Sequence, residues 1–106
     1  MAKFLIEATY TNKGMQGVLA KGGTARVEAI EKTLADVGGT LESFYFAFGG
    51  TDAYVLCDVP DTTTAAAIAI AVGASGAATT KTIVLLTADE IDRATHTQVA
   101  YTPPGG

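Results

Sequence analysis

A glycine-flanked basic cluster is the first set of residues whose types and spacing could do chemistry. Lys21, Gly22 and Gly23 precede a predicted helix, and Arg26 falls in its first turn. Free amides at a helix N-terminus, a lysine and an arginine can together hold a phosphate or a carboxylate. The glycine spacing of a P-loop is absent. A flexible loop, a helix cap and a solvated arginine would explain the same residues without a ligand.

A second set is aromatic and acidic. Asp52 lies beside a predicted tight turn and close in sequence to Tyr54. Tyr45 lies in the predicted strand on the other side of that turn. A carboxylate near phenols could do acid–base work, although an Asp in a turn more often accepts hydrogen bonds from turn amides. If they face the open side of a sheet, Tyr45 and Tyr54, together with Tyr10, would line a cavity. Otherwise they are interface residues with satisfied hydroxyls.

The composition argues against several other kinds of site. His96 is the only histidine and Cys57 the only cysteine, so the spacing offers no metal site, and we expect no metal and no cofactor. The net charge is −4 without a basic run, which disfavours nucleic acid and membrane partners. The single cysteine and the early carboxylate of Glu7, which is not typical of a signal peptide, favour the cytoplasm.

Hydrophobic periodicity predicts the elements that must position these residues. Alternating or continuous apolar runs predict strands over residues 3–10, 40–48, 53–59 and 79–87. Helical spacing and capping signals predict helices over residues 24–37, 62–74 and 88–95, with a glycine-containing loop over 11–22. Asp61 is the expected N-cap of the second helix, and Thr87 with Glu90 matches a capping box before the third.

The resulting order is β-α-β-β-α-β, which is the ferredoxin-like arrangement. We therefore expect one α+β domain over residues 1–96: an antiparallel sheet with two helices on one face, and a short C-terminal helix. Residues 97–106 would form a tail, in which 97–102 could be an edge strand before a flexible end. Large side chains occupy both faces of the strands, which predicts that two sheets pack face to face, as in a dimeric α+β barrel.

The second predicted helix offers another route to a homo-oligomer. Its outward positions carry Ala and Thr instead of Lys or Glu, and Ala67 and Ala71 are the candidate interface residues. Only 17% of the residues are charged, against a typical value of about 25%, so some apolar surface should be covered by another copy. A weakly polar helix face that is merely tolerated in solvent is the alternative.

The order of these short motifs resembles the GYD domain family over most of the chain. The resemblance rests on Tyr10, Lys21-Gly22, Arg26, Gly38-Gly39, Phe44-Tyr45, Gly50-Thr51-Asp52, Pro60-Asp61, Gly76, Thr79, Thr80 and Thr82. Thr51 stands where the family's namesake tyrosine would be, so no role of that tyrosine carries over. The resemblance implies a bacterial protein with a ferredoxin-like fold of the dimeric-barrel type, in a family with no established function.

Three functions are compatible with these features. The first is a non-enzymatic oligomeric module that binds a small ligand or another protein, favoured because no catalytic constellation is present. The alternative is a cofactor-free monooxygenase or isomerase, which needs Tyr45, Asp52 or Tyr54 to point into a cavity. The third is a nucleotide-binding signalling protein like the nitrogen-regulatory PII proteins. Those proteins bind the nucleotide with basic residues, and here only Lys13, Lys21 and Arg26 cluster in the first predicted loop and helix.

Overall fold

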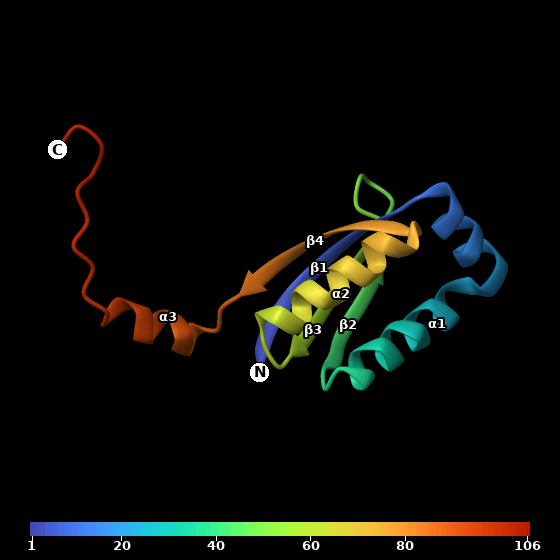
Figure 1. Cartoon of the computed structure of the whole chain (residues 1–106), viewed down its shortest axis with the longest axis horizontal. Helices are drawn as coiled ribbons and strands as arrows, with labels where there is room; N and C mark the ends of the chain where they lie inside the picture. Colours follow the sequence, from blue (N-terminus) through green and yellow to red (C-terminus); the bar gives the residue numbers. More distant parts are fainter.

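Four strands and three helices follow one another in the computed structural model, which describes all 106 residues (Figure 1). They are β1 (Ala2–Tyr10), α1 (Asn12–Asp36), β2 (Thr40–Phe46), β3 (Ala53–Val59), α2 (Thr62–Ser75), β4 (Ala78–Leu85) and α3 (Ala88–Thr95). The sheet order is β2-β3-β1-β4 and every pairing is antiparallel. The expected ferredoxin-like α+β order is therefore confirmed. The expected edge strand over 97–102 is wrong, because those residues are irregular.

The strand register divides the sheet into two faces. Phe4 of β1 lies opposite Cys57 of β3, whereas its neighbour Leu5 lies opposite Leu56 of β3 and Ile83 of β4. Because successive side chains of a strand point to opposite sides, these two rows cannot share a face. The row with Phe4 and Cys57 is buried, and the row with Leu5 is at most partly buried.

Both long helices pack on the buried face. Leu34 of α1 and Ala65 of α2 belong to one core cluster with Phe4 and Cys57. The thiol of Cys57 is free and fully buried, and this burial raises its pKa, as expected of a small core hydrophobe. Only 10 of 106 residues are buried, so the core is thin. Because α1 and α2 both pack on the buried face, the other face of the sheet, which we call the open face, has no cover from these helices.

The first helix begins twelve residues earlier than predicted. The predicted loop over 11–22 is wrong: α1 starts at Asn12, and the Thr11 side chain accepts a hydrogen bond from the Gly14 amide at 3.3 Å. Gly14 is required by a close approach, since a Cβ there would lie 2.0 Å from the carbonyl oxygen of Ala77. Gly14 therefore allows α1 to pack closely against Ala77, although glycine has a low helix propensity.

A kink at Gly22 divides α1 into two parts (Figure 1). Gly22 has φ 84° and ψ 173°, which is outside the helical region and costs glycine little. In the second part, Leu34 is buried and Val27 and Ile30 are half-buried. The helix ends at Asp36, and Gly38, at φ 78°, provides the left-handed residue after it.

The predicted cap of α2 gives a pH-dependent expectation. Asp61 accepts hydrogen bonds from the Thr64 hydroxyl at 2.7 Å and the Thr64 amide at 2.8 Å, and these bonds lower the pKa of Asp61. Because the pKa is lower in the folded state, this stabilisation is complete above about pH 4 and is lost as the pH falls through the folded pKa. We expect Asp61→Ala to lower the thermal midpoint by a few degrees at pH 7 and by less at pH 3. Equal losses at both pH values would contradict this.

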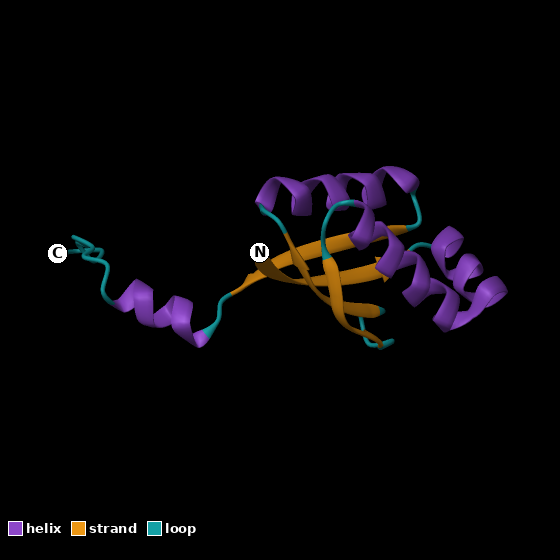
Figure 2. Ribbon diagram, turned by 90° about the horizontal axis from the view of Figure 1, so that it is seen from below, coloured by secondary structure: helices purple, strands orange, loops and turns teal.

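Residues 86–106, which we call the C-terminal arm, extend away from the sheet (Figures 1 and 2). The hydrogen bonds of this segment are internal, including the predicted capping box of Thr87 and Glu90. The arm raises the radius of gyration to 16.8 Å, whereas a compact chain of this length has about 13 Å. Its large apolar side chains are all exposed: Leu86, Ile91, Val99 and Tyr101.

Candidate functional site

An apolar hollow of about 420 Å³ lies between α1, α2 and the sheet, and we call it the helix groove. Ile6 of β1 and Val55 of β3 line it from the sheet, Ile30 lines it from α1, and Ile68 and Val72 line it from α2. Thirteen of its seventeen lining residues are hydrophobic. Its size and lining are those of small-molecule sites, which commonly measure about 300–1,000 Å³.

Small side chains form part of the groove lining. Ala71 lines the groove and stays exposed, and Ala77 and Ala78 line it beyond the end of α2. Larger residues there would fill the space between the helices. Ala67, the other candidate interface residue, is exposed on the same helix and does not line the groove.

Two candidate residues that the sequence analysis placed in separate sets come together in the groove. Arg26, from the basic cluster, is half-buried and is the only charged residue in the lining. Tyr10, from the tyrosine set, lines the same groove at the end of β1. Burial raises the pKa of Tyr10; the positive charge of Arg26 opposes the shift, and the negative charge of Asp52 adds to it. The phenol therefore stays protonated at neutral pH.

The rest of the basic cluster lies elsewhere. Lys21 and Gly22 are exposed at the kink of α1, and neither lines the groove. Gly23 lies under the ring of Phe46, where a Cβ would be 3.2 Å from Cε2. The basic cluster is thus divided by the kink, and only Arg26 enters the apolar space.

The remaining acidic and aromatic candidates are separated from the groove as well. Asp52 ties the β2–β3 connection to β1: its Oδ2 accepts from the Tyr10 amide at 2.9 Å, and its own amide donates to Ala8 at 2.9 Å. Tyr45 and Tyr54 lie opposite each other on β2 and β3, and the two residues are 71% and 38% exposed on the open face. Tyr45, Asp52 and Tyr54 therefore do not surround one cavity within a single chain.

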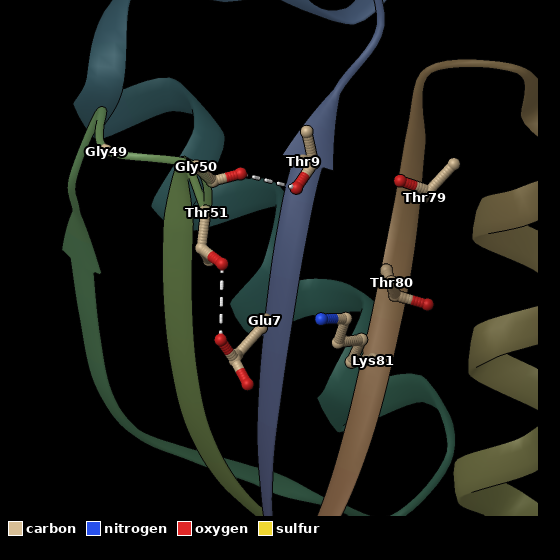
Figure 3. A pocket seen from close by; sticks show the side chains of 8 residues that line it. All are labelled: Glu7, Thr9, Gly49, Gly50, Thr51, Thr79, Thr80 and Lys81. Carbon is tan, nitrogen blue, oxygen red and sulfur yellow. Dashed lines mark hydrogen bonds between the residues drawn. The ribbon is translucent and has the colours of Figure 1, made fainter.

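A second, polar hollow of about 460 Å³ lies on the open face beside the β2–β3 connection (Figure 3). The Thr51 hydroxyl donates to Glu7 at 3.2 Å, and the Thr9 hydroxyl donates to the Gly50 carbonyl at 3.1 Å. Lys81 lies opposite Glu7 in the β1–β4 register. Strand alternation alone marks Glu7 and Lys81 as outward polar residues, and only the pairing of β1 with β4 places them together. This hollow has no hydrophobic lining residue, so a ligand there would meet only glycines and polar or charged side chains.

Sequence comparison identifies the family. The profile of the GYD domain family matches residues 4–95 of the 106-residue chain. The chain belongs to the GYD domain family. No curated protein and no solved structure matches it. The match spans β1 to α3 of this GYD domain, and it therefore includes the elements that form the helix groove.

Two further features of this GYD domain concern membranes and metal ions. None of its helices combines the length and the apolar character that a membrane crossing requires. No three His, Cys, Asp or Glu side chains gather in a cluster that could hold a metal ion.

Proposed function

We propose that this GYD domain is a non-catalytic module that binds a small, largely apolar molecule in the helix groove and acts as a homo-oligomer in the cytoplasm. The observation that carries the proposal is the apolar hollow of about 420 Å³ directly above the core. A ligand that fills it would remove apolar surface of both molecules from water, which is favourable. Binding is favoured over catalysis because Tyr45, Asp52 and Tyr54 do not line this groove.

Titration with N-phenylnaphthylamine, an uncharged probe that fluoresces in apolar surroundings, tests the groove. We expect saturable binding with one probe per chain. Ala71→Trp should abolish it, because the indole would occupy the groove from an exposed position on α2. Circular dichroism should show that the variant remains folded.

Ala67→Trp is the matched control, since Ala67 lies one turn earlier on α2, is exposed and does not line the groove. This variant should bind the probe as the wild type does. Uptake that never saturates, or equal binding by Ala71→Trp and the wild type, would contradict the proposed function.

The open face supports the homo-oligomer. Leu5, Leu56 and Ile83 are neighbours in the register of three adjacent strands, and Tyr54 adds a partly exposed ring. No helix of the same chain covers them, because α1 and α2 pack on the other face. Packing this face on its equivalent in a second copy would form a self-complementary interface. The exposed apolar residues of the C-terminal arm give the same support.

Native mass spectrometry of paired lysine variants tests this association. We expect the wild type to be a discrete oligomer and Leu56→Lys to be a monomer, because a lysine at the centre of the open face would be buried without a partner. Ala67→Lys should keep the wild-type mass. A monomeric wild type would contradict the association, and dissociation by Ala67→Lys alone would move the interface to α2.

A further inference from the structure

Arg26 is an unusual residue for the helix groove. It is half-buried among mostly hydrophobic lining residues, and it makes no ion pair: both ion pairs of the chain belong to Lys3, with Glu42 at 2.6 Å and Asp58 at 3.1 Å. A partly desolvated cation without a counter-ion is unfavourable, so a negative charge brought to it would be bound strongly.

The nearby side chains do not supply that charge within the groove. Arg26 is the only charged residue in the lining, and Asp52, whose charge acts on Tyr10, holds the Tyr10 amide at 2.9 Å. Tyr10 lines the same space, and its hydroxyl forms no hydrogen bond within the chain, so the hydroxyl remains available as a donor. A guanidinium and a phenol are both donors to an oxyanion.

The hydrophobic lining residues indicate that the rest of the ligand is apolar. The sheet floor and the facing sides of α1 and α2 are mostly apolar, with Ile6, Ile30 and Ile68 on three different elements. A hydrophilic anion such as inorganic phosphate would leave this surface in contact with water. An anion with an aromatic or alkyl body would cover it.

We propose that the helix groove selects an amphipathic carboxylate, with its apolar body between α1 and α2 and its carboxylate bound by Arg26 and the Tyr10 hydroxyl. This inference rests on the proposed function and adds the chemical class of the ligand. Arg26 supplies the charge and up to two parallel N–H donors, which fit the two oxygens of a carboxylate. Tyr10 adds a third donor at the end of β1.

Isothermal titration calorimetry with naphthoate and naphthamide tests whether the groove prefers a negatively charged ligand. The two compounds share one ring system, and naphthoate carries a carboxylate where naphthamide carries a neutral amide. At pH 7 the wild type should bind naphthoate at least about tenfold more tightly than naphthamide, the effect of one charge-assisted hydrogen bond. Arg26→Gln should remove this preference, so that the two compounds bind with affinities within about twofold of each other. Tyr10→Phe should weaken naphthoate binding by a smaller factor.

Lys21→Gln is the matched control, since it also removes one positive charge from α1 but at an exposed position outside the groove. It should keep the preference of the wild type. Equal binding of the two compounds by the wild type would overturn the carboxylate inference and leave the proposed function standing. A preference lost equally in Lys21→Gln and Arg26→Gln would also overturn it. Failure of the folded wild type to bind either compound would overturn both proposals.

Discussion

Gly14→Ala is expected to destabilise the fold by about 1–3 kcal/mol, although alanine is the better helix former. The new Cβ would lie 2.0 Å from the carbonyl oxygen of Ala77, which is backbone and cannot rotate away. The same contact region holds the Thr11 amide, which donates to Ala77 at 2.9 Å, and the Thr11 hydroxyl, which donates to Gly76 at 2.6 Å. Relief of the clash would therefore stretch the bonds that join α1 to the α2–β4 connection.

Gly17→Ala provides the matched control on the same helix. A Cβ at Gly17 meets nothing within 4 Å, so the substitution should stabilise the chain by about 0.5–1 kcal/mol through helix propensity alone. Urea unfolding followed by circular dichroism measures both changes. Stabilisation by both variants would show that α1 does not approach Ala77 in this way.

Leu34→Ala is the second large expected effect, with a loss of about 2–5 kcal/mol in the free energy of unfolding. Leu34 is 2% exposed and joins α1 to the core of the sheet, while its side chain also lines the helix groove. Removal of its three outer carbons would leave a cavity beneath that groove. The surrounding strands are too well paired to close over it.

Leu19→Ala is the comparison, because Leu19 lies on the first part of α1 and is 86% exposed. Its free energy of unfolding should change by no more than about 0.5 kcal/mol. Both variants can be measured by urea unfolding under identical conditions. A similar small change in the two would mean that the second part of α1 does not pack on the sheet.

Alternation and capping were sufficient to predict most of the elements. The strand expected over 53–59 is confirmed residue for residue, because buried Val55 and Cys57 alternate with outward Tyr54 and Asp58. The caps at Asp61 and Thr87 were equally local signals. The end of the second strand was the exception: the strand was expected to reach residue 48, but β2 ends at Phe46 and Phe48 is 70% exposed.

The first part of α1 could not be predicted because its glycines have a tertiary cause. Gly14 and Gly17 in a short window indicate a loop by propensity. Contact with Ala77, sixty-three residues later, explains Gly14, and no pattern along the chain reveals that contact. Gly22 does break the helix, but as a kink within α1 instead of the loop end that was expected.

The candidate site was predicted in its residues but not in its grouping. Arg26 and Tyr10 were both identified, the first as part of a helix N-terminus and the second with Tyr45 and Tyr54. Sheet register sends Tyr45 and Tyr54 to the open face, and the kink removes Lys21 from Arg26. The apolar space that joins Arg26 to Tyr10 depends on how far apart two helices lie, which the sequence does not encode locally.

Methyl NMR of the isoleucines during a naphthoate titration tests most directly whether the helix groove is the binding site. The chain has six isoleucines. Ile6, Ile30 and Ile68 line the groove, whereas Ile70, Ile83 and Ile91 are exposed on α2, the open face and α3. The account predicts that the three groove methyl signals shift together and saturate, while the other three stay in place. Saturable shifts at Ile83 with none at Ile6, Ile30 and Ile68 would contradict it and move the site to the open face.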